Sequence, residues 1–347
     1  MPERTGDARG PGRGRESVVG NPTEDELYAA AKMYWEEHAT QVQISRHLGT
    51  SRARVSRLLS EARRQGIVQI KVLPPAHRAS GDLAEQLREA LGLHAVYLSA
   101  STPHRFQTDS PVEALGRGLS PVLGQALTAL NLAPGDIMLV SSGRTMYEVA
   151  RHDLPSMPAV VVVPTLGGTD QSQGWYQTNE IARLFATNIG GRASFLYAPA
   201  LPGPDLYETL VQDESIQRVL RLWSHARVAV TSVGAPPILR EQLPQFIAPV
   251  MGSLMEAVGD LSSRFFDRTG APVAFPGSDR LVAVELATLQ ATPTVIAVAA
   301  GRERVAPLLA GASRGYFNQL VTDPATAELL IAAQATFPST PVQPAKA

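Results

Sequence analysis

The sequence predicts an α/β protein in two parts, an N-terminal winged helix-turn-helix and a larger, doubly wound parallel α/β domain. Three observations support this prediction. Two short helical patterns flank Gly49 and are followed by a brief strand-like run. Strand and helix patterns then alternate from about residue 81, as they do in parallel sheets covered by helices. The 347 residues are 44% hydrophobic, which is enough for a small domain and one sizeable core.

The segment 41–64 has the pattern of two helices joined by a tight turn. The first helix should bury Val42, Ile44 and Leu48 and end at Gly49. The apolar residues of the second helix recur at i, i+3, i+4 and i+7, and these are Val55, Leu58, Leu59 and Ala62. Ser51 is a suitable N-cap, because its hydroxyl can accept a hydrogen bond from a free amide. Such a pair leaves the second helix free to enter a major groove.

A third helix should precede this pair and a wing should follow it. Thr23 and Glu26 have the spacing of a capping box. The apolar face of the helix that they begin would consist of Leu27, Ala30, Ala31, Tyr34 and Trp35. The strand-like residues of the wing are Ile67, Ile70 and Val72. We therefore expect a disordered tail over 1–22, the winged module over 23–73, a linker over 74–80 and the larger domain over 81–340.

Positive charge is concentrated in the predicted reading helices. Residues 41–71 contain seven basic residues and one acid, a net charge of +6, in a chain whose formal charge is −1. A solvated helical face is the alternative interpretation, but a local basic surface beside a helix pair favours operator DNA as partner. The residues expected to contact DNA are Gln41, Ser51, Arg52, Ala53, Arg54, Ser56 and Arg57. Arg52 and Arg57 are the candidates for reading guanine, whereas Gln41 and Arg54 would contact phosphates.

Composition excludes several other classes of protein. The chain has no cysteine, so disulfides and thiolate metal sites are excluded. No apolar run approaches the roughly 20 residues of a membrane span, and the N-terminus lacks a hydrophobic signal segment. The seven histidines show no metal-binding spacing. We therefore expect a cytoplasmic protein with no metal, cofactor or membrane partner.

The larger domain should be a Rossmann-like sheet with helices on both faces. After a helix that contains Leu83, Leu87 and Leu91, the strand candidates are Ala95–Leu98, Ile137–Val140, Ala159–Val163, Ser194–Tyr197, Val228–Thr231, Leu281–Val284, Thr294–Val298 and Gln319–Val321. The helix candidates between them are Val112–Leu130, Asn179–Ile189, Glu208–Leu222, Arg302–Ala312 and Ala325–Ala335. Ligands of such domains bind at the carboxyl ends of the strands.

Three loops at predicted strand ends are rich in small and polar residues. In GDIMLVSSGRTMYEVA, small residues and hydroxyls lie between a strand and a helix N-terminus, where an anion can bind. Thr165, Gly167 and Gly168 follow the next strand, and Gly301 and Arg304 follow a later one. Each loop alone is equally compatible with an ordinary βα turn. Together they favour a site for a phosphate or a polyol.

These motifs, in this order, resemble those of the SorC/DeoR-type sugar-binding transcriptional regulators. The resemblance rests on an SRxxVSRLL recognition helix, a GIVxI wing, an SGRT loop, a strand ending in LGG, and the later AVGDLSSRFFDRTG and VIAVAAGRER motifs. It covers nearly the whole chain from Thr23 onward. It implies an effector domain like that of sugar-phosphate isomerases, and assembly into homodimers or homotetramers.

The resemblance also implies which residues contact the effector. Phosphate or sugar oxygens would lie against Ser142, Gly143, Arg144 and Thr145 of the SGRT loop, and against Gly167, Gly168, Asn179, Asp260 and Arg304 elsewhere. Aromatic residues such as Trp175, Tyr176 and Tyr197 are able to stack on a sugar ring, although packing in a core or interface is their commoner role.

Two function classes remain open, a ligand-responsive transcription factor and a sugar-phosphate isomerase with an accessory DNA-binding domain. The only lysines are Lys32, Lys71 and Lys346. Residues 72–345, which include the larger domain, therefore contain no lysine that could form a Schiff base with a sugar carbonyl. Reversible, non-covalent sensing of a sugar or phosphorylated sugar is therefore favoured. An isomerase would need a carboxylate base, for which Asp260 or Glu180 are the candidates.

Overall fold

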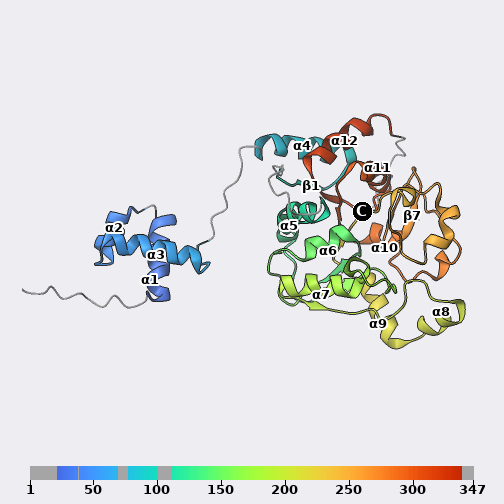
Figure 1. The fold of residues 1–347 in the computed structure, drawn as a ribbon, viewed down its shortest axis with the longest axis horizontal. Helices are drawn as coiled ribbons and strands as arrows, with labels where there is room; N and C mark the ends of the chain where they lie inside the picture. Colours follow the sequence, from blue (N-terminus) through green and yellow to red (C-terminus); the bar gives the residue numbers. More distant parts are fainter. Residues whose placement is uncertain (1–21, 38, 69–76, 101–110, 338–347) are drawn as a thin grey trace, which may run out of the picture. The chain divides into compact units, whose positions relative to one another are not determined.

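A computed structural model describes residues 22–37, 39–68, 77–100 and 111–337 of the chain. They form two compact units, divided between Leu73 and Pro74, and each unit is described by itself (Figure 1). The predicted tail up to residue 21 lies outside the described residues. So do Ile70 and Val72 of the predicted wing.

The smaller unit consists of three helices, α1 (Glu24–Trp35), α2 (Gln41–His47) and α3 (Arg52–Arg64). Capping boxes begin the first two helices, with Thr23 and Thr40 as the N-caps. The three helices share a core that consists of Leu27, Ala30, Ala31, Ile44, Val55, Leu58, Leu59 and Ala62. The predicted helix pair and the helix in front of it are thus confirmed.

Three details of this unit differ from the prediction. Val42 is 41% exposed, whereas Ile44 is fully buried. Two residues correspond to about 200° around a helix, so these side chains cannot both face the core. Tyr34 lies in the last turn of α1 and is 37% exposed. Ile67 packs half-buried against the helices in a bend rather than in a strand.

The larger unit contains a seven-stranded parallel sheet within its described residues. Its strands are β1 (Ala95–Leu98), β2 (Ile137–Val140), β3 (Val161–Pro164), β4 (Arg192–Ala193), β5 (Val228–Thr231), β8 (Thr294–Val298) and β9 (Gln319–Thr322). Their order is β1-β9-β8-β5-β2-β3-β4. From β2 the chain adds strands toward one edge, and from β5 it adds them toward the other. The order therefore reverses between β2 and β5, which confirms the doubly wound prediction.

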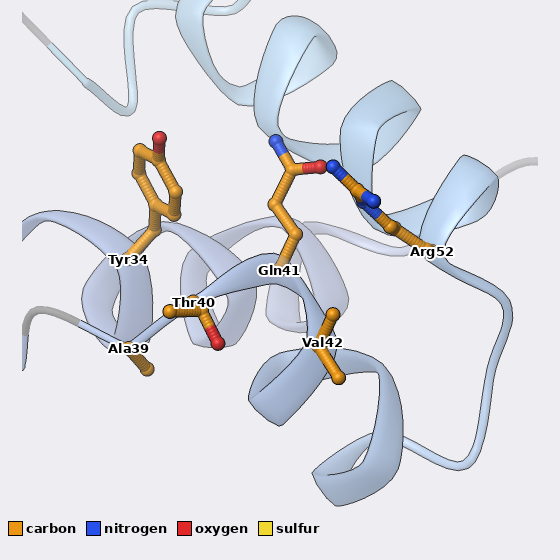
Figure 2. A pocket seen from close by; sticks show the side chains of 6 residues that line it. All are labelled: Tyr34, Ala39, Thr40, Gln41, Val42 and Arg52. Carbon is orange, nitrogen blue, oxygen red and sulfur yellow. The ribbon is translucent and has the colours of Figure 1, made fainter.

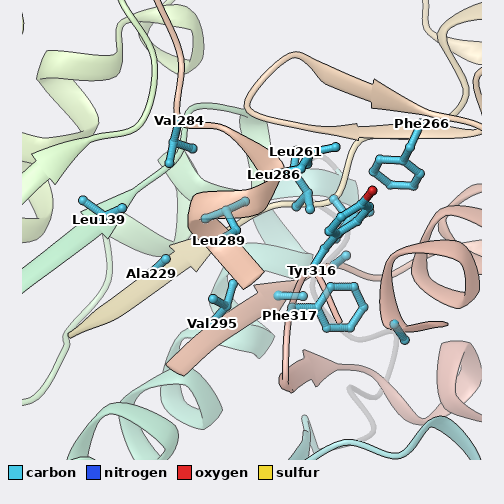
Figure 3. Packing of buried hydrophobic residues seen from close by; sticks show 14 of the residues in the cluster. Leu139, Ala229, Leu261, Phe266, Val284, Leu286, Leu289, Val295, Tyr316 and Phe317 are labelled. Atoms are coloured by element: carbon cyan, nitrogen blue, oxygen red, sulfur yellow. The ribbon is translucent and has the colours of Figure 1, made fainter. Parts of the chain in front are cut away.

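Helices cover both faces of this sheet. One face packs against α5 (Pro111–Ala129), α6 (Arg144–Ala150) and α7 (Thr178–Ile189). The other packs against α4 (His77–Leu91), α9 (Glu214–Trp223), α10 (Leu286–Ala291), α11 (Val305–Ser313) and α12 (Pro324–Gln334). Successive strand residues point to opposite faces, so Met138 lies in the first core and Leu139 in the second. Figure 3 shows Leu139 among the residues of the second core.

An irregular segment between β5 and α10 forms a third, smaller core. It contains the short 3-10 helices η2 (Pro237–Leu239), η3 (Ala248–Leu254) and η4 (Ser278–Arg280), and the antiparallel hairpin of β6 (Gly259–Leu261) and β7 (Arg264–Phe266). Isolated bridges join Leu166 to Ala283 and Gly234 to Asp260. These bridges attach the segment to the loops that follow β3 and β5, so it lies at the carboxyl ends of the strands.

Several predicted elements have different bounds in the structure. The helix expected over 208–222 is two helices, α8 (Pro204–Leu210) and α9, because Asp213 caps the amides of Ser215 and Ile216. Residues 194–197 form no strand, since β4 ends at Ala193. Residues 281–284 bond to two separate loops, those of Thr165–Gly167 and Ala200, and so join no ladder. The short 3-10 helices η1 (Gly174–Tyr176) and η5 (Arg302–Arg304) precede α7 and α11.

Candidate DNA interface and effector site

Most of the predicted DNA-contacting residues lie at the N-cap or in the first two turns of α3. Ser51 caps the helix, and its Oγ accepts a hydrogen bond from the Arg54 amide at 3.2 Å. Ser51, Arg52, Ala53, Ser56 and Arg57 are all exposed. Five of the seven predicted residues are therefore accessible to a partner.

A shallow hollow lies where α2 and α3 begin. It is lined by Tyr34, Ala39, Thr40, Gln41, Val42 and Arg52. Figure 2 shows the Gln41 amide and the Arg52 guanidinium extending toward the same place from the two helices. Amide and guanidinium donors are the groups that position a protein on DNA phosphates. The exposure of Val42 and Tyr34 is also explained, since both side chains border this hollow.

Arg54 differs from its neighbours because it already has an acidic partner. Its Nη2 lies 3.2 and 3.3 Å from the two carboxylate oxygens of Glu26. Glu26 is also the capping-box residue of α1. The pair therefore fixes α1 against the start of α3. Local sequence patterns do not predict this pair, because the two residues are 28 positions apart.

The loops after β2 and β5 meet at the point where the strand order reverses. The Ser232 amide donates to Ser141 Oγ at 2.9 Å, and Ser232 Oγ donates to the Ser142 carbonyl at 3.1 Å. Doubly wound domains bind their ligands in the crevice at this point. Ser232 was not predicted, because it follows β5 in a run with no recognisable motif. The sheet topology alone brings it to the SGRT loop.

Gly143 has a conformation and surroundings that require glycine. Its φ is +122°, and a Cβ there would lie 2.9 Å from Ser232 Oγ. Its amide donates to the Trp175 carbonyl at 2.9 Å. α6 begins at the next residue, Arg144, and both Arg144 and Thr145 are half-buried. The absence of a side chain at Gly143 thus allows Ser232 to approach the loop closely, while the Gly143 amide is bonded to the Trp175 carbonyl.

Arg144 connects two loops at the strand ends. Its guanidinium carbon lies 4.8 Å from the centroid of the Trp175 ring, within the range of a cation–π contact. Its Nη2 donates to Gln242 Oε1 at 2.9 Å. The guanidinium has five donors in all, so these contacts orient it without exhausting it.

Gly167, Gly168 and Asn179 hold the neighbouring loops in place. The Gly167 amide donates to the Val282 carbonyl at 2.9 Å, and the Gly168 amide donates to the Ala198 carbonyl at 2.8 Å. A Cβ on Gly167 would lie 2.7 Å from the Ala198 carbonyl oxygen. Asn179 donates to the Leu196 carbonyl at 3.1 Å and accepts from the Leu196 amide at 2.9 Å. These residues thus shape the carboxyl edge of the sheet, whatever further contacts they make.

Asp260 is a buried partner of a positively charged cluster. Its Oδ1 accepts a hydrogen bond from Arg240, and its Oδ2 accepts the Ser263 amide at 2.8 Å. Arg304 donates to the Val233 carbonyl at 2.7 Å, and its Nε lies 3.6 Å from Glu303 Oε1. Burial, and then the nearby charge of Arg240, lower the pKa of Arg304. Arginine stays protonated in proteins, so two desolvated cations persist beside the strand ends.

The turn between β6 and β7 is strained. Its two central residues, Ser262 and Ser263, have φ of +51° and +63°, a region that is rare for residues with a Cβ. Ser262 Oγ lies 2.6 Å from Thr165 Oγ1, and Ser263 is held by Asp260. Sequence reasoning did not predict the serines. Such turns usually carry glycine or asparagine, and strain of this kind concentrates at functional sites.

Hydroxyls and arginines thus gather at the carboxyl ends of β2, β3, β5 and β8. This combination suits an oxygen-rich ligand, with hydroxyls that donate and accept and guanidinium groups that bind anions. Within the described ranges, no three acidic or histidine side chains gather as metal ligands. None of the described helices has both the length and the apolar composition of a membrane span.

The chain is similar to known proteins over most of its length. Residues 77–332 match a family model described as "Putative sugar-binding domain". The deoxyribonucleoside regulator of Bacillus subtilis (strain 168) is 31% identical over 309 residues, which cover 87% of this chain and 96% of that protein. The sorbitol operon regulator of Klebsiella pneumoniae is 29% identical over 310 residues, with coverage of 87% and 96%.

Solved structures agree with these sequence matches. The crystal structure of the full-length sorbitol operon regulator SorC from Klebsiella pneumoniae has a TM-score of 0.74 and 28% sequence identity, and it covers 90% of this chain and 100% of that one. A DeoR family transcriptional regulator from Listeria monocytogenes, at 23% identity and a TM-score of 0.62, has the same fold over 73% of this chain. The chain therefore belongs to the SorC/DeoR-type family of sugar-binding transcriptional regulators.

Proposed function

We propose that reversible binding of a sugar or phosphorylated sugar controls the affinity of this regulator for operator DNA. The smaller unit, through α3 and the hollow beside it, would bind the operator. The larger unit would bind the effector, and the protein would work in the cytoplasm, where operator DNA lies. Two relatives are named for a sugar alcohol and for deoxyribonucleosides, which favours a small polyol or sugar phosphate as the effector.

The main support for the proposal is the contact between the loop that follows β2 and the loop that follows β5. Ser141 and Ser142 bond to Ser232 at the point where strand order reverses, which is where doubly wound domains bind ligands. The residues proposed to contact the effector are Ser142, Gly143, Arg144, Thr145, Gly167, Gly168, Asn179, Asp260 and Arg304. The arginines would bind its anionic group, and the hydroxyl, amide and carboxylate groups would bind its hydroxyls.

We infer that the domain senses its ligand without converting it. The two carboxylates that could act as an isomerase base already have partners. Asp260 is bonded to Arg240, and Glu180 is bonded to Arg183 at 2.6 Å, a contact that lowers the pKa of Glu180. Both carboxylates are therefore engaged in ion pairs within the protein. Turnover of a sugar phosphate by the purified protein, abolished by Asp260→Asn, would contradict this inference.

A thermal-shift screen tests the proposed function directly. The purified full chain is heated with matched pairs of free and phosphorylated sugars and sugar alcohols. A ligand at 100 times its dissociation constant should stabilise the protein by about 2.7 kcal/mol. The stabilising ligand should then change the affinity for operator DNA. A ligand that binds but leaves operator affinity unchanged would contradict the regulatory part of the proposal.

Thr145→Val tests whether the SGRT loop contacts the effector. The substitution removes a hydroxyl donor and nearly preserves shape, so effector affinity should fall by roughly two- to tenfold, the effect of one hydrogen bond. Operator affinity without effector should not change. Thr128→Val is the matched control, because Thr128 is exposed and its hydroxyl bonds only within α5, to Gly124. Equal effector affinity in both variants and the parent would show that the loop is an ordinary βα turn.

Assembly is the remaining part of the proposal. One helix-turn-helix reads only a few base pairs, so specificity calls for at least two on half-sites about one helical turn apart. We expect a homodimer or homotetramer, with the effector favouring one arrangement of the paired helices. Light scattering should give a multiple of the 37.1 kDa chain mass. A strictly monomeric mass, both free and on operator DNA, would overturn this expectation.

A further inference from the structure

Trp175 lies beside the loop proposed to bind the effector. It is the central residue of η1, which follows β3 and precedes α7. Its carbonyl oxygen accepts the Gly143 amide at 2.9 Å, so the backbone of η1 is bonded directly to the loop after β2. This contact places the indole at the same end of the sheet as the junction between Ser142 and Ser232.

The indole ring is held from two sides. The guanidinium of Arg144 lies over it at 4.8 Å, and the Tyr147 ring meets it nearly edge-on, with 6.5 Å between ring centroids. The backbone of η1 packs closely against Tyr147, because a Cβ on Gly174 would lie 2.7 Å from that ring. Trp175 is therefore a fixed part of the loop cluster.

The polar atom of this ring has no partner. The Trp175 Nε1–H is buried and makes no hydrogen bond within the described residues. Buried indole N–H groups normally find an acceptor. Trp223 follows that rule, since its Nε1 donates to the Pro164 carbonyl at 2.9 Å. The Trp175 donor therefore has no acceptor among the described residues.

We propose that Trp175 is a ligand-contacting residue of the effector site, whose indole N–H donates a hydrogen bond to an oxygen of the bound sugar or sugar phosphate. The inference rests on the proposed function and adds a donor to it. A sugar hydroxyl or a phosphate supplies the missing acceptor, whereas an apolar ligand does not. Trp175 thereby selects for oxygen at one position of the ligand, and Arg144 above the ring adds its charge at the adjacent position.

Calorimetry on the full chain tests this contact with sorbitol 6-phosphate, free sorbitol and 2-deoxyribose 5-phosphate as probes. Trp175→Phe keeps an aromatic ring beneath Arg144 and removes the N–H together with the five-membered ring of the indole. The dissociation constant for the probe that the parent binds should rise about tenfold, as expected for one hydrogen bond to a polar ligand. Trp35→Phe, in the DNA-binding unit, is the matched control and should leave that constant unchanged.

A second measurement does not depend on the Trp175→Phe variant folding. The chain has three tryptophans, so ¹⁵N labelling gives three indole signals. Trp35→Phe and Trp223→Phe identify two of them, and the third belongs to Trp175. The probe should shift the Trp175 signal most. An unmoved signal together with an unchanged dissociation constant in Trp175→Phe would overturn this inference and leave the proposed function standing. A parent that binds none of the three probes, and that no sugar of the thermal-shift screen stabilises, would overturn the proposed function itself.

Discussion

Replacing Asp260 with alanine is expected to lower the free energy of unfolding of the larger unit by about 3–5 kcal/mol, the cost of breaking a buried ion pair from one side. The side chains of Asp260 and Arg240 are 10% and 18% exposed. Loss of the carboxylate leaves Arg240 desolvated, without its anionic partner and near a second cation, Arg304. Burial, and then the charge of Arg240, already lower the pKa of Arg304. The Ser263 amide also loses its acceptor in a strained turn.

Urea unfolding of the variant, followed by circular dichroism, measures this loss. Asp279→Ala is the matched control, because Asp279 is exposed in η4 and its removal should change stability by less than about 0.5 kcal/mol. Asp260→Asn keeps the shape and one acceptor, so its loss should be smaller than that of the alanine variant. Equal stability of Asp260→Ala and Asp279→Ala would show that the ion pair contributes nothing.

This prediction also distinguishes two roles of Asp260, binding of effector hydroxyls and stabilisation of the β6–β7 turn. A residue that only binds effector hydroxyls can be removed without cost to the free protein, and its loss should appear only in effector affinity. A residue that holds the β6–β7 turn should destabilise the protein whether or not effector is present. The contacts to Arg240 and Ser263 favour the second role. Unfolding measured without effector distinguishes the two.

Local sequence patterns were sufficient to predict most of the fold. The apolar periodicity of α3 and the alternation of strands and helices depend on residues close in sequence, which is why these elements were correctly placed. Errors arose where a single polar residue or a distant segment decides the structure. Asp213 divides one predicted helix by capping the second half. The segment 281–284 looks like a strand, but its partners are loops from two different parts of the chain.

The candidate site was predictable only where a loop carries a motif. The SGRT loop has one, because glycine is required at Gly143 by its φ and by close packing. Ser232, Arg240 and Trp175 have none, since each reaches the strand ends through the sheet topology rather than through spacing in the sequence. The same applies to the pairing of Arg54 with Glu26, which links two helices. Long-range contacts of this kind need coordinates.

Arg57→Ala is expected to weaken operator binding by about 1–3 kcal/mol for each recognition helix, roughly 5- to 150-fold, because one bidentate contact to guanine is lost. Arg57 is exposed on the face of α3 opposite its core. Among the described residues Arg57 makes a long contact, from its Nε to the Ala53 carbonyl at 3.5 Å. Its donors are thus available to a base. By contrast, Arg54 is paired with Glu26, and Arg64 with Glu61 at 2.8 Å.

Fluorescence anisotropy tests this difference, with a duplex selected by the parent protein from a random pool and a scrambled duplex of equal length. Arg57→Ala should lose affinity for the selected duplex and little for the scrambled one, so the ratio of the two affinities should fall. Arg64→Ala is the matched control, because its charge is partly neutralised by Glu61 and it lies in the last turn of α3. It should weaken binding to both duplexes slightly and reduce the salt dependence. If Arg57→Ala instead weakens both duplexes equally and lowers the salt dependence, Arg57 contacts a phosphate, and the reading of guanine rests with Arg52.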